Sequence, residues 1–124
     1  MCTGTIDTVV FPEDVPTASV SDLPSDGYLL LDVRESDEWQ AGHAPEAVHI
    51  PLRDVPVRMD ELADQVDERP VYVVCRTGGR SAQATAYLNA HGYEAVNIAG
   101  GMKSWHTEGR PMVADEPGAD PEVL

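Results

Sequence analysis

Basic residues are scarce in this sequence, and long apolar runs are missing. Only 8 of the 124 residues are Lys or Arg, against 22 Asp or Glu, which gives a formal net charge of -14. Binding to nucleic acid or to an anionic membrane needs a dense basic face, so this charge argues against both kinds of partner. No apolar run approaches the ~20 residues that cross a bilayer, which argues against a membrane-spanning chain.

Cysteine is also rare, since the chain has only Cys2 and Cys75. Two cysteines are too few for the disulfide framework of a small secreted domain. Neither has a second cysteine nearby, which argues against a zinc knuckle and a C-x-x-C redox pair. The first residues lack the basic start and apolar stretch of a secretory signal. We therefore expect a cytoplasmic protein in which each cysteine acts alone.

The length fits one domain, because compact domains cluster near ~100 to 150 residues, and 42% hydrophobic residues suffice for one core. We expect a domain at 15–111, an N-terminal tail at 1–14 and an acidic C-terminal tail at 112–124. The last segment, MVADEPGADPEVL, combines Pro, Gly and acidic residues with little to bury. The acidic surplus favours a halophilic protein, because counterions in a salty interior screen the self-repulsion of such a chain.

Strand-like and helical patterns alternate between the two tails. Continuous apolar runs favour strands buried on both faces, and TASV favours a further short strand. These strands are expected at 28–33, 47–50, 70–75, 95–99 and 17–20. Helical patterns lie at 36–41, around 59–66, at 81–92 and at 102–107. This alternation predicts an α/β fold with a mainly parallel sheet.

Two of the helical patterns carry specific signals. Between the second and third apolar runs, four residues spaced i, i+3, i+4 and i+7 share one face of an amphipathic helix. They are Met59, Leu62, Ala63 and Val66. In the next helix, Ser81 is expected as the N-cap and Gly92 as the C-terminal stop.

The segment VVCRTGGRSAQA, residues 73–84, joins the end of a buried strand to the start of a helix. In parallel sheets, ligands bind at the carboxyl ends of strands, and a helix N-terminus offers unpaired N–H groups. Cys75 lies where both effects meet. We expect the amides of residues 76–80 to aim at its sulfur, with both glycines free to take positive φ. This environment lowers a thiol pKa, so Cys75 is predicted to be substantially ionised at neutral pH.

Three stretches follow one another in a specific order: LLLDVRESDEWQAGHAPEAVHIPL, VVCRTGGRSAQA and AVNIAGGMKSW. They resemble the D-V-R, E-[FWY] and G-H segment, the C-R-x-G-x-R-S active loop and the C-terminal G-G-[MIL]-x-x-W of the rhodanese family, the single-domain sulfurtransferases. The resemblance covers about residues 15–110. Glu46 stands where the family usually has glycine, and His49 stands where asparagine is common.

The resemblance implies a three-layer fold, with a five-stranded parallel sheet and helices on both faces. It also implies chemistry through a persulfide on Cys75, with Arg76 and Arg80 holding the anionic group of the donor. The other loop residues assigned to donor binding are Thr77, Gly78 and Gly79. Supporting roles are assigned to Ser81, Asp32 and Arg34.

On this interpretation the Cys75 thiolate attacks the outer sulfur of a donor such as thiosulfate, and sulfite leaves. A thiol, dithiol or cyanide then collects the sulfur, so the expected kinetics are ping-pong. A redox protein is one candidate acceptor. These steps need no metal and no organic cofactor.

Two other functions suit the same loop. A phosphatase or arsenate reductase would use its amides to bind phosphate-like anions. Phosphatase loops of the cysteine type place five residues between cysteine and arginine, whereas Arg80 leaves four and Ser81 occupies the required position. The third candidate is a sulfur-carrier or partner-binding module whose acidic surface docks a basic protein.

The remaining candidate residues favour structural roles. His43 and His49 lack cysteine partners and an H-E-x-x-H helix, so they make a weak metal site. Glu38 is interpreted as a helix acid rather than a catalytic group. Trp39 and Trp105 are interpreted as packed aromatic residues, with Trp105 near the cleft.

Overall fold

The centre of the molecule is a five-stranded sheet in which every strand pair is parallel. The computed structural model describes residues 15–124, so the tail predicted at 1–14, with Cys2, lies outside the described residues. The strands are β1 (Thr17–Ala18), β2 (Leu29–Asp32), β3 (Val48–His49), β4 (Val71–Val74) and β5 (Ala95–Ile98). Their order across the sheet is β1-β5-β4-β2-β3. The predicted α/β fold is confirmed.

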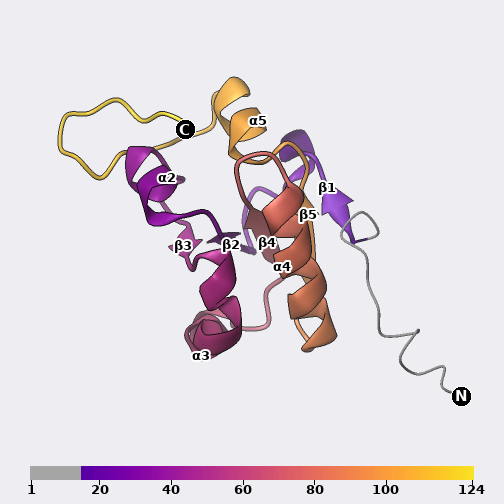
Figure 1. Cartoon of the computed structure of the whole chain (residues 1–124). Coiled ribbons are helices and arrows are strands. Elements are labelled where there is room, and N and C mark those ends of the chain that lie inside the picture. The colour runs from indigo at the N-terminus through magenta and orange to yellow at the C-terminus, as the bar shows by residue number, and fades with distance from the viewer. Residues whose placement is uncertain (1–14) are drawn as a thin grey trace, which may run out of the picture.

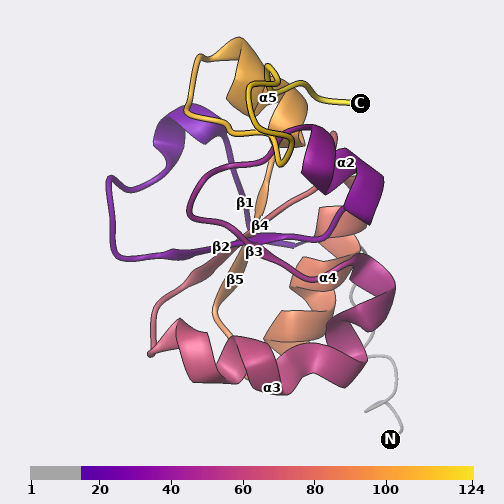
Figure 2. The ribbon, with the colours of Figure 1, turned by 90° about the vertical axis from the view of Figure 1, so that its left-hand side faces the viewer.

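Helices cover both faces of this sheet, as expected (Figure 1). They are α2 (Ser36–Ala41), α3 (Val55–Val66), α4 (Gly79–Ala90) and α5 (Gly101–Thr107). Figure 2 views the sheet along its edge, with α3 and α4 on one side and α2 and α5 on the other. Among residues 15–124, no helix combines the length and the apolar character needed to cross a membrane.

Each face of the sheet buries its own apolar cluster, because successive strand residues point to opposite sides. In β2, Leu31 packs on the side of α3 and α4 with Leu62 and Leu88. Leu30 packs on the other side with Trp105 of α5. All four residues of β2 are buried. Burial on both faces explains why the sequence shows continuous apolar runs there instead of alternation.

The structure corrects the expected start of α4. This helix begins at Gly79 with Gly78 as its N-cap, two residues before the position predicted from Ser81. Ser81 does not cap the helix because its side chain turns toward Cys75 and Asn97. The expected stop at Gly92 is confirmed, because the helix ends at Ala90 with His91 as its C-cap and Gly92 follows with a φ of 93°.

Two smaller expectations also differ from the structure. Ala63 is exposed, because the buried stripe of α3 runs through Val55 and Leu62, and Ala63 lies at its edge. The strand expected at 17–20 ends at Ala18, because a 3-10 turn, η2 (Val20–Asp22), begins there.

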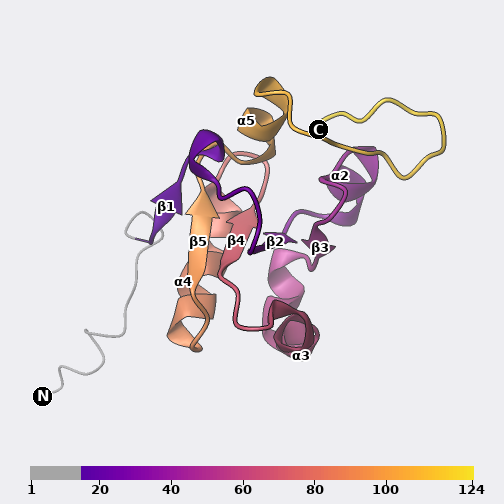
Figure 3. The same cartoon turned by 180° about the vertical axis from the view of Figure 1, so that it is seen from behind.

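The segment 112–124, expected to be an acidic tail, contains no helix and lies along α2 (Figures 1 and 3). Val113 forms an isolated antiparallel bridge with His43 just after α2. The amide of Asp115 donates to the carbonyl of Gln40 at 3.0 Å, and the amide of Glu122 donates to that of Ala41 at 2.9 Å. These main-chain bonds fix the path of the segment next to the carboxyl end of the sheet.

Candidate active site

Cys75 follows β4 directly, and the chain then turns back over its sulfur before entering α4. The amide of Gly78 donates to Sγ at 3.1 Å, and the hydroxyl of Ser81 donates to Sγ at 3.3 Å. Burial raises the pKa of the Cys75 thiol, but hydrogen bonds from the Ser81 hydroxyl and from the Ser81, Gly78 and Thr77 amides outweigh it. The net effect lowers the pKa, so the site favours a thiolate.

The sulfur lies between this turn and the core. Cys75 is 1% exposed and belongs to the apolar cluster beneath α3 and α4. The amides that bond to Sγ come from Thr77, Gly78 and Ser81. Thr77 and Gly78 belong to the nest expected from residues 76–80, whereas Ser81, in the first turn of α4, lies outside that range.

The turn requires two glycines, one within it and one in the helix that packs against it. Gly78 has a φ of 128°, a conformation that other L residues rarely adopt. Of the two glycines expected to be free to take positive φ, only Gly78 does so, and Gly79 starts α4. The second required glycine is Gly101, with a φ of 56°, where an added Cβ would lie 2.6 Å from the carbonyl oxygen of Arg76.

The N-terminus of α5 supports the turn through hydrogen bonds to its carbonyl groups. The amide of Met102 donates to the carbonyl of Cys75 at 2.8 Å, and the amide of Lys103 donates to that of Arg76 at 3.1 Å. These bonds use amide groups that have no partner within their own helix. The close approach that they require explains the glycine at position 101.

Arg80 is held by a carboxylate of α2. Its two terminal nitrogens donate to Oε1 and Oε2 of Glu38 at 2.7 and 2.8 Å. These hydrogen bonds lower the pKa of Glu38 to about 2 against the opposing effect of burial. The same contact raises the pKa of Arg80 further above its already high value. Glu38, interpreted from the sequence as a plain helix acid, therefore ties α2 to the first turn of α4.

Asp32 and Arg34 form a fully buried ion pair at the end of β2. The guanidinium of Arg34 also donates to the carbonyl of Gly42 at 2.7 Å and to that of Glu38 at 3.3 Å. Both carbonyls belong to α2 or the residue after it. The pair therefore supports the turn at one remove, by fixing the helix that carries the partner of Arg80.

Asn97 of β5 is a site residue that sequence reasoning missed. Its amide nitrogen donates to the carbonyl of Gly78 at 3.3 Å, and its Oδ1 accepts from the Ser81 hydroxyl at 2.5 Å. The hydroxyl has one proton, so Asn97 and the sulfur of Cys75 compete for it. The only signal in the sequence is a polar residue inside the apolar run AVNIA.

Arg76 lies on the exposed side of the turn, and its Nε donates to the main-chain oxygen of Leu124 at 2.6 Å. Arg34 and Arg80 are instead paired with carboxylates. The contact brings the end of the 112–124 segment next to the residue that follows the cysteine.

The two candidate metal-binding histidines flank Trp39. The ring of His43 stacks on Trp39 at a centroid distance of 3.6 Å, and that of His49 stacks at 4.6 Å. His43 Nε2 lies 3.0 Å from Oδ1 of Asp115, and His49 Nε2 lies 2.8 Å from the carbonyl of Arg34. Among residues 15–124, no group of three His, Cys, Asp or Glu is placed to hold a metal ion.

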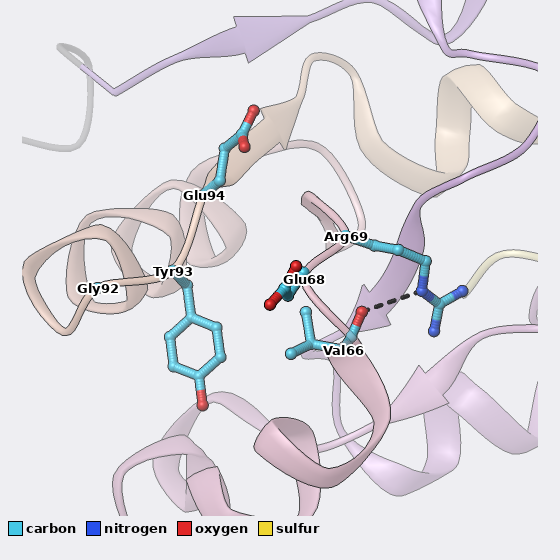
Figure 4. Close-up of a pocket in the computed structure, with 6 residues that line it drawn as sticks. All are labelled: Val66, Glu68, Arg69, Gly92, Tyr93 and Glu94. Atoms are coloured by element: carbon cyan, nitrogen blue, oxygen red, sulfur yellow. Dashed lines mark hydrogen bonds between the residues drawn. The ribbon is translucent and has the colours of Figure 1, made fainter.

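A surface hollow lies at the opposite end of the sheet (Figure 4). Its lining precedes β4 and β5, whereas Cys75 follows β4. Arg69 in this hollow donates to the carbonyls of Val66 and Gln65, at 3.0 and 2.6 Å. The lining residues are Val66, Glu68, Arg69, Gly92, Tyr93 and Glu94. The hollow is therefore separate from the cysteine turn.

Similar proteins are known. Residues 17–108 match the model of the rhodanese-like domain family. The chain is 38% identical over 102 residues to the putative sulfurtransferase YtwF of Bacillus subtilis, over 80% of this chain and 95% of that protein. It is 32% identical over 92 residues to the thiosulfate sulfurtransferase GlpE of Pseudomonas savastanoi, over 73% of this chain and 84% of that protein.

A solved structure extends the likeness to the fold. The rhodanese-related protein of Thermoplasma volcanium is 30% identical and superposes with a TM-score of 0.70, over 82% of this chain and 99% of that one. The matched residues include the whole parallel sheet, the cysteine turn and the N-terminus of α5 that supports it. The chain therefore belongs to the rhodanese family of sulfurtransferases.

Proposed function

We propose that this sulfurtransferase takes sulfane sulfur from a small anionic donor of the thiosulfate type and passes it on through a persulfide on Cys75. The carrying observation is the set of donors around Sγ, with the Gly78 amide at 3.1 Å and the Ser81 hydroxyl at 3.3 Å. They favour the thiolate, which is the nucleophilic form of cysteine. The name of the Pseudomonas relative, a thiosulfate sulfurtransferase, supports the choice of donor.

The first half-reaction loads the cysteine. The Cys75 thiolate attacks the outer sulfur of thiosulfate, a new S–S bond forms, and the S–S bond of the donor breaks. Sulfite leaves with the electron pair of that bond. The total charge is unchanged, because the thiolate becomes a persulfide anion while the donor dianion becomes the sulfite dianion. No oxidant or reductant is consumed.

The second half-reaction unloads it. A thiolate or cyanide attacks the outer sulfur of the persulfide, and the Cys75 thiolate is restored as the leaving group. With cyanide the product is thiocyanate. The amides that face the sulfur stabilise this leaving thiolate as they stabilised the nucleophile, so one geometry serves both steps. A dithiol acceptor, such as a redox protein, would take the sulfur on one thiol and expel it as hydrogen sulfide when its second thiol closes the disulfide.

The other site residues act through position and charge in this proposal. Arg76, at the mouth of the turn, binds the anionic group of the donor. Arg80 adds positive charge from within its ion pair with Glu38 and favours both the thiolate and the arriving anion. Amides from Thr77, Gly78 and Ser81 hold the sulfur, Gly79 starts the helix, and Asp32 with Arg34 fixes α2.

Intact-mass analysis tests the proposal. We expect one added sulfur atom after incubation with thiosulfate or mercaptopyruvate, no addition in Cys75→Ser, and full addition in Cys2→Ser. Loss of the added sulfur on treatment with cyanide completes the cycle. Absence of added sulfur in the wild type with every donor would overturn the proposal.

The same samples separate the two alternative functions. Turnover of an aryl phosphate above the Cys75→Ser background would favour the hypothesis of a phosphatase or arsenate reductase. A persulfide that passes its sulfur only to one protein partner, and to no small thiol or cyanide, would favour the hypothesis of a sulfur carrier. Turnover with small acceptors and none with aryl phosphate is the result we expect.

A further inference from the structure

The three arginines around the cysteine turn differ in what holds them. Arg34 is buried and paired with Asp32, and Arg80 makes two hydrogen bonds to the Glu38 carboxylate. Charge-assisted bidentate pairs of this kind are the strong ones. Arg76 instead contacts the main-chain oxygen of Leu124, on the exposed side of the turn. Arg76 is exposed and makes a single hydrogen bond, so its present contact is the one that an arriving anion replaces most easily.

Residues 112–124, whose last residue contacts Arg76, are held along α2 by main-chain hydrogen bonds. The amides of Val113 and His43 each donate to the carbonyl of the other, at 2.8 and 2.9 Å. Farther along, the amide of Glu122 donates to the carbonyl of Ala41 at 2.9 Å. Val123 is half-buried against the apolar cluster that includes Trp105. The segment is thus attached on both sides of its acidic middle.

Gly42, at the end of α2, makes room for this segment. An added Cβ there would lie 2.6 Å from the main-chain oxygen of Glu122 and 2.8 Å from its nitrogen. The φ of Gly42 is 176°, which is extended backbone open to any residue. The position therefore needs glycine because of the packing of residue 122, and not because of its own conformation.

We propose that residues 112–124 form a strap that selects the sulfur donor by its charge: an anionic donor must compete with the end of the strap for Arg76. The strap carries four acidic residues, which oppose the approach of a small dianion. They are Asp115, Glu116, Asp120 and Glu122. An alkyl persulfide has no anionic head group for Arg76 to hold, so it needs neither Arg76 nor its release, and the strap disfavours thiosulfate relative to such a donor. This inference rests on the proposed function.

The kinetic test loosens the strap without touching the cysteine turn. Val123→Ser removes its apolar attachment, and Val57→Ser is the matched control, because Val57 is 80% exposed on α3. We expect kcat/KM with thiosulfate to rise about threefold to tenfold in Val123→Ser, the range of one modest hydrogen-bonding contact. With a simple alkyl persulfide, which has no anionic head group, we expect no change, and Val57→Ser should match the wild type with both donors.

Gly42→Ala provides a second variant, since it displaces residue 122 directly, and it should act in the same direction as Val123→Ser. Equal gains with thiosulfate and with the alkyl persulfide would overturn charge selection by the strap. An unchanged or lower kcat/KM with thiosulfate in both folded variants would also overturn it.

A second measurement does not depend on sulfur transfer. Sulfate has the charge of thiosulfate but no transferable sulfur, so it probes Arg76 alone. We expect sulfate to accelerate hydrogen exchange of the Glu122 amide in a saturable way, beyond sodium chloride at matched ionic strength. Arg76→Gln should abolish this effect. If Cys75 forms a persulfide normally while sulfate leaves Glu122 exchange unchanged, the strap fails and the proposed function stands. If no donor loads Cys75, the proposed function fails whatever sulfate does.

Discussion

At the scale of single residues, the ionisation of the Cys75 thiol follows from opposing effects on one sulfur atom. Burial at 1% exposure disfavours the thiolate, while amide and hydroxyl donors favour it and prevail. Access and ionisation are therefore separate properties of this thiol. A low pKa raises the fraction of reactive thiolate, but the closed turn limits which reagents reach it.

The pH dependence of alkylation tests this balance. Because the pKa of Cys75 is lowered, its iodoacetamide rate should rise with pH and level off at a lower pH than that of a free thiol, whose pKa is ~8.5. Ser81→Ala removes a donor at 3.3 Å from Sγ, so the inflection should move to higher pH and the rate near neutral pH should fall roughly tenfold. Both proteins should carry Cys2→Ser, so that only one cysteine reacts. An inflection that stays in place in Ser81→Ala would show that the hydroxyl does not stabilise the thiolate and that its proton goes to Asn97.

At the scale of elements, most of the fold was predictable from the sequence because its strands are buried on both faces. Such strands leave continuous apolar runs, and a segment like PVYVVC is recognisable without any knowledge of its neighbours. Helix ends were less predictable, since Ser81 has the chemistry of an N-cap but uses its hydroxyl on Cys75 and Asn97. A long-range contact overrode the local preference there.

Contacts between elements that are distant in sequence escaped prediction. Glu38 and Arg80 are 42 positions apart, and only the packing of α2 beside α4 brings them together. The path of residues 112–124 was missed for a related reason. The segment is attached mainly by main-chain hydrogen bonds, which leave no pattern in the amino-acid sequence. Its acidic composition, with little to bury, therefore predicted a tail. The cysteine, its flanking arginines and its glycines were predictable because they are consecutive.

The support that α5 gives to the turn can be tested at Gly101. Gly101→Ala places a Cβ against the carbonyls of Cys75 and Arg76 and strains a φ of 56°, so the carbonyls or the helix must move. We expect a loss of about 2 kcal/mol or more in the free energy of unfolding, together with slower persulfide formation. Gly118→Ala is the matched control, because Gly118 has a φ of 81° with nothing within 4 Å of an added Cβ. Urea unfolding measures both. Equal losses in the two variants would mean that backbone strain alone matters and that the contact with the turn does not.

At the scale of the whole molecule, the dominant feature is the formal net charge of -14. Like charges on a compact chain repel one another, and unfolding relieves the repulsion by spreading them apart. The Debye length shrinks from ~10 Å at 0.1 M salt to ~3 Å at 1 M, so salt should reduce this penalty. Salt also weakens exposed ion pairs such as Arg58 with Glu61, but each such pair contributes only ~0 to 1 kcal/mol. With 22 acidic residues and 8 basic ones, most acidic residues have no basic partner, so repulsion between them outweighs the attraction within ion pairs.

The midpoint of thermal unfolding should therefore rise between low and molar sodium chloride. Screening is not the only effect of salt, because concentrated salts also strengthen apolar burial. A variant separates charge screening from apolar burial. Asp60 and Asp64 are exposed on α3, and replacing both with Asn makes the net charge less negative without altering the core. If repulsion governs the salt response, this variant should be more stable than the wild type at low salt and should gain less from added salt, so that the two midpoints converge. Parallel curves would assign the response to apolar burial, and a midpoint that does not rise at all would remove the case for a halophilic protein.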